Sequence, residues 1–584
     1  MKGRERNPST PVENLVIGSI IEVDGTHIVA ELDSEIKELS RVYGGDVYQI
    51  GQFGSIVKVH FGRRIIYGYV ARLRMKAEYE RDKGGSVSAS ATGRIIEVDL
   101  FGEGEWVSKP NLEQANWELN FDRGVSTFPL PQQKLYLTPN SELAFVFGND
   151  DGANIQIGEH VGSGGTPCYA DMNELLGKHT AVLGSTGAGK SGTVAAILHS
   201  ILERGAVAQH DNWSPRIVIL DPHNEYGDAF PEHVRLSTDE DSLSLPYWLL
   251  NFQEIISLVI GKTEFVATSQ SNIVKSALLT ARQAACVEID GVDKNSITVD
   301  SPIPFVWQDF INYVENDKPP QASKQESHNS ILQKLQVLRT DARLSFIMED
   351  WDGASDPLAD VISQFLGGSN DPVRIVDLSG VPNEVAGAAN SAIARTLFTI
   401  KLWQTKEERE HTPVLLVCEE AHRYVPNRGE AQYEAAQEAI RRLAKEGRKY
   451  GVGLMLVSQR PSEVEATVLS QCNSWIVLRT TNNSDREHVK SILPDSMSGL
   501  TKMLSGLKRR EAIFVGQAAM LPSRILMRRL EENQLPRSHD INFDRGWQNI
   551  PITEEAITAV GNRWRVQRRE VSSSVVDFPH KASE

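Results

Sequence analysis

The stretch Ala181-Val182-Leu183-Gly184-Ser185-Thr186-Gly187-Ala188-Gly189-Lys190-Ser191 runs from an apolar segment into a glycine-rich loop. The spacing Gly-x-x-x-x-Gly-Lys-Ser is typical of a loop that cradles phosphate groups between a strand and a helix. Glycines allow backbone N–H groups to curl around phosphate oxygens, where Cβ atoms would crowd the ligand. We predict a strand over Thr180 to Leu183, a helix over Ser191 to Leu202, and a nucleoside triphosphate site between them. A chance glycine loop would lack these flanking elements.

Two side chains at the start of the predicted helix suit this ligand. We expect Lys190 to reach the β- and γ-phosphates and the Ser191 hydroxyl to bind Mg²⁺, at a helix end whose dipole favours anions. The predicted cofactors are therefore ATP and Mg²⁺. The residues predicted to bind the nucleotide are Gly184, Ser185, Thr186, Gly187, Ala188, Gly189, Lys190, Ser191 and Gly192.

A second apolar run, Val414 to Cys418, predicts a strand that ends in two acids, Glu419 and Glu420. Beside a phosphate-binding loop, one such carboxylate helps to hold Mg²⁺, directly or through water, and the next polarises the attacking water. We assign Glu419 to the metal and Glu420 to the role of base. The alternative is a pair of solvated acids at the start of a loop.

Acids also follow the predicted strand Arg216 to Leu220. Ligands of open α/β sheets lie outside the carboxyl ends of the strands, so Asp221 and Glu225 are expected to point toward the nucleotide or its metal. We predict Asp221 as a metal ligand and Glu225 as a catalytic residue. The alternative is a Pro-containing turn in which Asn224 adopts left-handed torsions.

The predicted helix Glu430 to Tyr450 carries Arg441, Lys445 and Arg448 along one face. A basic helical face is usually solvated surface, but this one lies between the acid pair and the next predicted strand. That strand ends at Gln459, which is placed to sense the γ-phosphate. One of the arginines is a candidate to enter the site of a neighbouring subunit.

The composition describes a large globular chain of 584 residues, with 40% hydrophobic and 24% charged residues. Its length allows two to four domains. A net charge of −16 excludes a surface coated in basic residues but allows a local basic channel for nucleic acid. Four scattered cysteines suggest neither a zinc site nor a disulfide framework. With no apolar run long enough for a bilayer, we expect no membrane segment and a cytoplasmic protein.

The chain divides into three parts by pattern. Residues 1–150 hold short apolar or alternating runs between glycine turns and predict a small all-β barrel. Residues 151–530 alternate strands and helices, which predicts an α/β domain with a parallel sheet and a mostly helical insertion at about 238–371. Residues 531–584 are polar and predict a tail, with one helix around Thr553 to Gln567.

Taken together, these residues resemble the HerA family of hexameric DNA translocases, in the HerA/FtsK branch of P-loop ATPases. The segments that carry the resemblance are Gly184 to Ser191, Asp221-Pro222-His223-Asn224-Glu225-Tyr226, Glu419-Glu420-Ala421-His422, Glu446-Gly447-Arg448-Lys449-Tyr450-Gly451 and Ser458-Gln459-Arg460-Pro461. The resemblance implies a RecA-like ATPase core, a homo-hexameric ring, double-stranded DNA in its pore, and a nuclease or other effector on the barrel side. It also implies that Arg448 is the arginine acting in trans and that the tail crosses to a neighbour. Asn224 stands where the family often has glycine, and Glu419 where many relatives have aspartate.

The expected function is an ATP-driven DNA translocase that works with a separate nuclease or anti-phage effector. An ATP-binding hexamer that scaffolds and activates an effector, with little DNA pumping, is the alternative, and a conjugation-type pump ranks lowest. We expect sequence-independent DNA binding by basic residues lining a pore. Lys508, Arg509 and Arg510 are the first candidates, with a solvated turn as the alternative.

Overall fold

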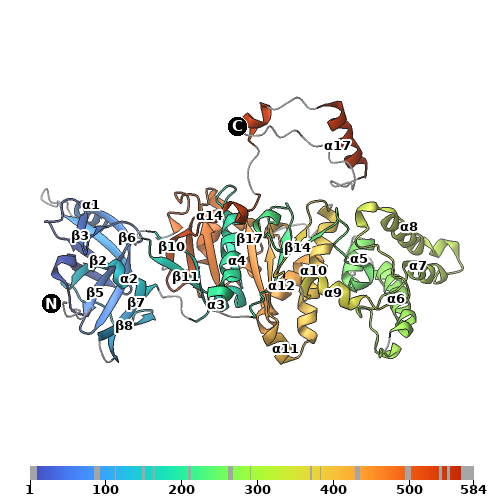
Figure 1. Cartoon of the computed structure of the whole chain (residues 1–584), viewed down its shortest axis with the longest axis horizontal. Helices are drawn as coiled ribbons and strands as arrows, with labels where there is room; N and C mark the ends of the chain where they lie inside the picture. Colours follow the sequence, from blue (N-terminus) through green and yellow to red (C-terminus); the bar gives the residue numbers. More distant parts are fainter. Residues whose placement is uncertain are drawn as a thin grey trace.

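A computed structural model of the chain shows its parts in a row (Figure 1). The N-terminal strands lie at one end, a large sheet flanked by helices occupies the middle, and a cluster of helices forms the other end. The structure describes residues 9–84, 93–111, 114–147, 152–161, 165–207, 212–260, 268–289, 291–367, 371–381, 383–427, 434–493, 501–537, 542–548 and 553–566.

The N-terminal part contains a closed antiparallel barrel. The strand order β2-β1-β9-β5-β6-β7 closes because β2 also pairs with β7, and β8 extends the sheet beyond β7. Its interior is apolar, with Ile17, Val98 and Leu135 fully buried. The predicted small β-barrel is therefore confirmed. The strands are β1 Val16–Asp24, β2 His27–Leu32, β5 Ile56–Phe61, β6 Arg64–Met75, β7 Arg94–Asn111, β8 Gln114–Arg123 and β9 Lys134–Leu137, beside a separate hairpin of β3 Ser40–Tyr43 and β4 Asp46–Gln49.

The central sheet has the order β11-β10-β20-β19-β18-β12-β17-β16-β13-β15-β14 in the described residues. Neighbours from β18 to β14 pair in parallel, as predicted, whereas β18 to β11 pair antiparallel. The sequence prediction did not include β10, β11, β14 or β20. The strands are β10 Asn154–His160, β11 Pro167–Asp171, β12 Thr180–Leu183, β13 Ile217–Asp221, β14 His233–Ser237, β15 Val373–Asp377, β16 Val414–Cys418, β17 Val452–Ser458, β18 Ser474–Leu478, β19 Glu511–Gly516 and β20 Ser523–Met527.

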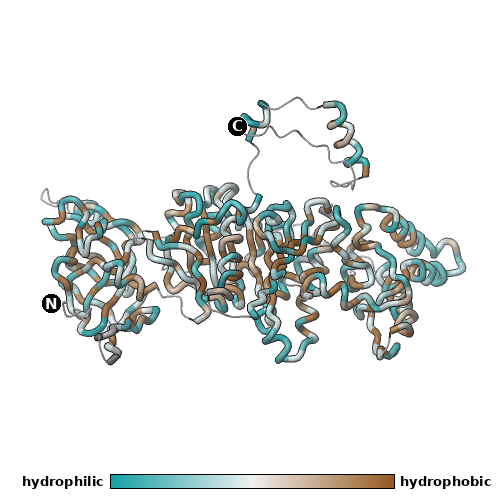
Figure 2. Tube along the Cα trace, viewed as in Figure 1, coloured by the Kyte–Doolittle hydropathy of each residue, from teal (hydrophilic) through white to brown (hydrophobic). Residues whose placement is uncertain are grey.

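Helices cover both faces of the parallel strands, which explains their unbroken apolar runs. Alternate residues pack to opposite sides: Val182 joins the cluster beneath α4, whereas Ala181 joins the cluster beneath α10 and α12. Figure 2 shows the hydrophobic trace concentrated along these strands. The helices around the sheet and barrel are α1 Lys76–Asp82, α2 Asn140–Val146, α3 Met172–Gly177, α4 Lys190–Val207, α10 Asn383–Trp403, α11 Lys406–His411, α12 Glu434–Glu446, α13 Ala466–Leu469 and α14 Asn483–Ile492.

The predicted helical insertion is present and forms the end of the molecule away from the barrel (Figure 1). It is anchored to α10 because the buried Glu254 accepts bonds of 2.9 Å from Arg395 Nε and Ser391 Oγ. α8 starts at Glu326. The helices are α5 Phe252–Ile260, α6 Thr268–Ala285, α7 Trp307–Asn316, α8 Glu326–Thr340 and α9 Leu358–Leu366.

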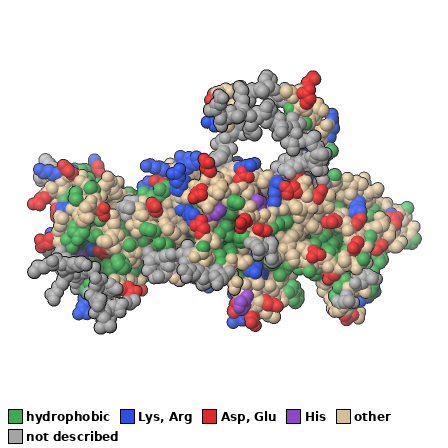
Figure 3. Space-filling view, in the orientation of Figure 1, with side chains coloured by type: hydrophobic (Ala, Val, Ile, Leu, Met, Phe, Trp, Pro, Cys, Tyr) green, Lys and Arg blue, Asp and Glu red, His purple; other side chains and the backbone are tan. Residues whose placement is uncertain are grey.

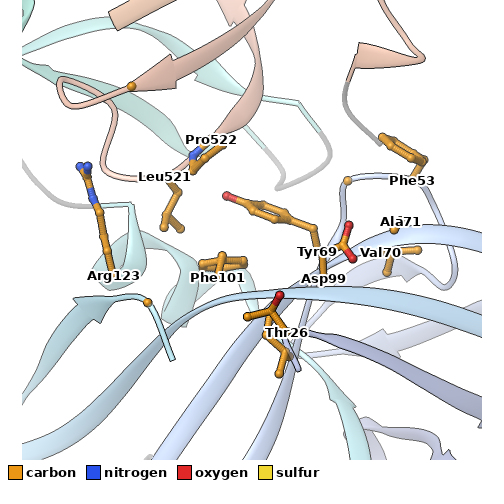
Figure 4. A pocket seen from close by; sticks show the side chains of 14 residues that line it. Thr26, Phe53, Tyr69, Val70, Ala71, Asp99, Phe101, Arg123, Leu521 and Pro522 are labelled. Atoms are coloured by element: carbon orange, nitrogen blue, oxygen red, sulfur yellow. The ribbon is translucent and has the colours of Figure 1, made fainter. Parts of the chain in front are cut away.

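The barrel meets the ATPase part at the connection between β19 and β20. Arg123 of the barrel donates hydrogen bonds to the carbonyls of Gln517 and Ala519 in this connection. A cavity of about 360 Å³ opens at the junction, with Tyr69, Phe101 and Leu521 among its lining residues (Figure 4). The connection between β19 and β20 thus contacts the barrel part directly.

The C-terminal segment stands away from the rest of the chain in Figure 1. It contains α16 Phe543–Trp547 and α17 Glu554–Val566, so the predicted helix around Thr553 to Gln567 is confirmed. The polar tail prediction beyond residue 566 lies outside the described residues. No helix in the described ranges combines the length and apolar character needed to span a bilayer.

Candidate active site

The predicted phosphate-binding loop connects β12 to α4 with glycines where its backbone requires them. Gly187 and Gly189 have φ of +72° and +99°, which most side chains adopt only with strain. A Cβ on Gly184 would lie 2.9 Å from Leu478 Cβ on the neighbouring strand. The loop is tied to that strand, since Ser185 N donates to the Arg479 carbonyl at 2.9 Å.

Lys190 and Ser191 begin α4 and face the acids of neighbouring strands. Ser191 Oγ lies 2.7 Å from Glu225 Oε2 and 3.5 Å from Glu419 Oε1. Burial lowers the pKa of Lys190, although Glu419, Glu420 and Glu225 pull it upward. The two predicted ligand-binding side chains and the three predicted acids therefore surround one space at the carboxyl edge of the sheet.

Glu419 is buried at the end of β16 and accepts a hydrogen bond of 3.1 Å from the Tyr226 hydroxyl. Burial and the charge of Glu420 raise the pKa of Glu419 to about 8, against the opposing charge of Lys190. Its Oε2 atom is buried without a hydrogen-bond partner among the described residues. A cation beside Ser191 would satisfy this oxygen and keep the carboxylate ionised.

These features fit Mg²⁺ bound together with a nucleotide. The described residues contain no group of three or more His, Cys, Asp or Glu placed to hold a metal by themselves. Mg²⁺ commonly takes one or two protein oxygens and completes its shell with water and substrate phosphates. A hydroxyl and one carboxylate are thus sufficient protein ligands for that ion.

Glu420 stands in a strained backbone conformation, with φ 52° and ψ 48°. Side chains other than glycine, Asn and Asp seldom adopt this region, and such strain is often found at functional sites. Gln459 Nε2 donates to Glu420 Oε1 at 2.7 Å, and His422 Nδ1 lies 3.2 Å from Oε2. Burial raises the pKa of Glu420, which suits a group that accepts a proton.

Gln459 joins this acid to the phosphate-binding loop. Its Oε1 accepts a hydrogen bond of 2.5 Å from Thr186 Oγ1, while its amide nitrogen holds Glu420. Thr186 is exposed at the tip of the loop, where a ligand would lie. A ligand that displaced the Thr186 hydroxyl would therefore shift Gln459 and the residues after β17.

Asp221, predicted as a metal ligand, binds backbone N–H groups of the turn that follows β13. Its two oxygens accept the backbone N–H groups of His223 at 3.2 Å, Glu225 at 2.8 Å and Tyr226 at 3.0 Å. Burial raises its pKa to about 6 against these bonds. Asp221 thus shapes the turn that presents Glu225 to Ser191, and its role as a metal ligand stays a prediction. Asn224 in this turn has φ 53°, the left-handed torsion expected if the segment is a Pro-containing turn.

Arg448 lies at the other edge of the sheet from this site. The predicted helix ends earlier than expected, since α12 stops at Glu446 and Arg448 sits on a 3-10 turn, Gly447–Tyr450, that leads into β17. The part of the prediction before Glu434 lies outside the described residues. Arg448 contributes to the lowered pKa of His179, which burial brings to about 4, and His179 precedes β12. In its own subunit Arg448 cannot reach Lys190.

The Lys508 to Arg510 turn, predicted to contact DNA, lies beside the phosphate-binding loop instead of standing apart from it. The Arg510 backbone nitrogen is 3.8 Å from the position of a Cβ on Gly189. The Arg510 side chain donates to the Met527 carbonyl at 2.6 Å. Contact of this turn with DNA stays a prediction, and its position favours a role near the nucleotide.

Sequence reasoning gave no role to Tyr226, although it quoted the residue. Tyr226 and Glu419 follow neighbouring strands of the sheet but lie 193 residues apart in the sequence, so no local signal joins them. The start of the C-terminal segment was also missed: Arg537 N donates to the Glu225 carbonyl at 2.7 Å, and its side chain pairs with Asp228. The segment therefore holds the turn that carries Glu225.

Known proteins resemble this chain over most of its length. The family model described as Helicase HerA, central domain, matches residues 155–397. A probable helicase of Methanocaldococcus jannaschii is 24% identical over 433 residues, 74% of this chain and 76% of the relative. The DNA double-strand break repair helicase HerA of Pyrococcus furiosus is 25% identical over 485 residues, 76% of this chain and 80% of the relative.

A solved structure, VirB4 of Thermoanaerobacter pseudethanolicus, aligns with a TM-score of 0.48 at 17% identity, over 66% of this chain and 99% of that chain. Residues 155–397 match the HerA helicase central domain, and the chain is a P-loop ATPase that is similar to HerA helicases over most of its length.

Proposed function

We propose that this chain forms a homo-hexameric ring that hydrolyses ATP with Mg²⁺ and moves double-stranded DNA through its pore. In this proposal a nuclease or an anti-phage effector docks on the barrel face. Support comes from relatives named as helicases, one of them for DNA double-strand break repair. The observation that carries the proposal is the Thr186–Gln459–Glu420 chain, because it joins the nucleotide to the base and to a loop beyond β17.

The roles proposed for hydrolysis follow from the contacts. Lys190 neutralises phosphate charge, and Ser191 with Glu419 would hold Mg²⁺, which supplies electrostatic stabilisation of the phosphates when bound. Glu420 accepts a proton from the attacking water, and Gln459 holds that carboxylate in place. Glu225 keeps the Ser191 hydroxyl oriented, at 2.7 Å.

The proposed motion starts at Gln459. The γ-phosphate would compete for the Thr186 hydroxyl, and the freed Gln459 would move with the residues that follow it. Those residues are coupled to the loop after Glu420: Asn427 N donates to the Glu463 carbonyl at 2.7 Å, and Glu465 N to the Val425 carbonyl at 2.8 Å. Two loops at one edge of the sheet would thus move as a unit with the state of the nucleotide.

The scaffold alternative rests on a different observation. The β3–β4 hairpin of the barrel pairs Val42 with Val47, and both side chains are exposed, at 62% and 68%. A small apolar surface of this kind suits a protein partner. Turnover stimulated by a purified partner and indifferent to DNA would favour the scaffold.

Displacement of a triplex-forming strand from duplex DNA tests the motor directly. We expect ATP-dependent displacement by the wild-type ring, none by Glu420→Gln, and ATP turnover that rises with duplex DNA in the absence of partner. The rise should be insensitive to DNA sequence and should fall with salt. ATP turnover without any displacement would contradict the proposal.

A further inference from the structure

A pocket of about 460 Å³ opens at the amino-terminal edge of the parallel sheet, opposite the phosphate-binding loop. Its walls come from the segments that lead into β13, β16 and β17, together with α3 and α4. The ionisable side chains that line it are Arg216, His411 and Arg448, with no Asp or Glu among the lining residues. The pocket therefore presents two guanidinium groups and one imidazole with no carboxylate side chain among its lining residues.

The two arginines have no carboxylate partner among the described residues. Arg216 makes a long hydrogen bond of 3.5 Å to the Ser214 carbonyl. The charge of Arg216 also affects Lys401, because burial and Arg216 together lower the pKa of Lys401 to about 8. Arg448 is exposed and lies on the turn that leads into β17. An unpaired guanidinium is suited to phosphate, which it binds through two parallel N–H groups.

The pocket cannot serve the nucleotide of its own subunit. β17, Val452–Ser458, runs its full length between the Arg448 turn and Gln459. At about 3.3 Å per residue, a strand of this length separates the two edges by about 20 Å. An anion in the pocket must therefore come from another molecule.

A ring supplies that molecule. In a cyclic assembly with head-to-tail contacts, one surface of each subunit meets a different surface of the next. The carboxyl edge of this sheet is rich in buried acids around the phosphate-binding loop, and the amino edge presents unpaired arginines. If the carboxyl edge of one subunit faced the amino edge of the next, the unpaired arginines would lie beside the acids and the phosphate-binding loop of the neighbouring subunit.

We infer that the pocket receives the phosphates of the nucleotide bound by the neighbouring subunit, with Arg216 as a second cation beside Arg448. The inference rests on the proposed ring. It adds a residue, on the segment before β13, that neither the family resemblance nor the phosphate-binding motif indicates. The apolar part of the wall includes Met172 and Pro413 and leaves room for more of the nucleotide than its phosphates.

Single substitutions give the first test. Arg216→Ala should lower ATP turnover at least about tenfold, within the range that a second charge at a phosphoryl group supplies. Arg216→Lys, which keeps the charge, should retain part of the activity and guards against a folding defect. Lys449→Ala, an exposed neighbour of Arg448 outside the pocket, is the matched control and should turn over ATP like the wild type. Wild-type turnover in Arg216→Ala would overturn the inference.

Mixed rings decide between action in trans and a structural role. Arg216→Ala and Lys190→Ala subunits, coassembled and verified by native mass spectrometry, should regain turnover because some interfaces combine an intact Lys190 with an intact Arg216. ATP carrying an azidoanilide on its γ-phosphate should label residues 212–217 or 411–415 of the Lys190→Ala subunit. If the wild-type ring is active but the mixed rings show no recovery, or if the label is confined to the subunit with intact Lys190, the inference is overturned. If the wild-type chain forms no ring or shows no turnover, the proposed function is overturned as well.

Discussion

The two edges of the central sheet differ in charge, in burial and in backbone strain. At the carboxyl edge, Glu419 and Glu420 are buried beside Lys190, and Glu420 is held at φ 52°. At the amino edge, Arg216 and Arg448 line a pocket without acidic residues. In the inferred ring, each subunit would carry both halves of a phosphate site and keep them a strand length apart.

Surface charge agrees with this division of labour. Acidic and basic side chains are interspersed over the face seen in Figure 3. Each of the following substitutions removes a component of one edge and leaves the other edge intact.

The largest loss is expected for Lys190→Ala. Removing the cation that faces three acids and the phosphates should lower turnover by about a thousandfold or more, and nucleotide affinity should fall with it. Titration calorimetry and a phosphate-release assay measure both. Lys445→Ala, an exposed lysine on α12, is the control for loss of a positive charge.

Glu420→Gln is expected to separate binding from chemistry. It removes the base but keeps the size of the side chain and its bond to Gln459, so turnover should fall by about a hundredfold or more while ATP stays bound. Calorimetry on the two variants gives the comparison. Equal losses of affinity in Lys190→Ala and Glu420→Gln would show that Glu420 holds the nucleotide instead of activating water.

A smaller effect on turnover is expected for Gln459→Ala. The variant breaks the link from Thr186 to Glu420, so DNA displacement should fall more steeply than ATP hydrolysis. Thr186→Val, which removes the hydroxyl and keeps the shape, should reproduce the change in their ratio. A constant ratio of displacement to hydrolysis in both variants would remove Gln459 from the coupling path.

The smallest effect concerns stability and pH. The raised pKa of Glu419, about 8, means that the folded protein binds a proton that the unfolded chain releases above its ordinary pKa of 4.5. The nucleotide-free protein should therefore lose stability as pH rises from about 5 to 8. Glu419→Gln should flatten this dependence in thermal unfolding. A melting temperature that rises over the same range in the wild type would contradict the burial argument.

Much of the parallel sheet could be predicted because burial on both faces produces unbroken apolar runs, as in Val414 to Cys418. β14 and β20 were missed because they carry polar residues: His233 and Arg235 in the first, Ser523 and Arg524 in the second. β14 and β20 form strands because they pair with neighbouring strands, and their own residue patterns do not indicate a strand.

The same distinction holds for the site. The proximity of Lys190, Ser191 and the Glu419–Glu420 pair could be predicted because each follows a strand at a recognisable spacing, and their roles stay predictions. The surroundings of Asp221 and Arg510 could not be predicted. Backbone N–H groups bind the Asp221 carboxylate, and tertiary packing brings Arg510 close to Gly189. The strain at Glu420 is likewise set by the fold and not by the residue type.

Coassembly of Lys190→Ala with Arg448→Ala subunits tests most directly whether the two edges meet across subunits. Each variant alone should be inactive, and verified mixed rings should regain ATP turnover, because some interfaces pair an intact Lys190 with an intact Arg448. The recovery should depend on the mixing ratio and be highest near equal amounts. Rings of confirmed mixed composition that stay inactive at every ratio would contradict the account.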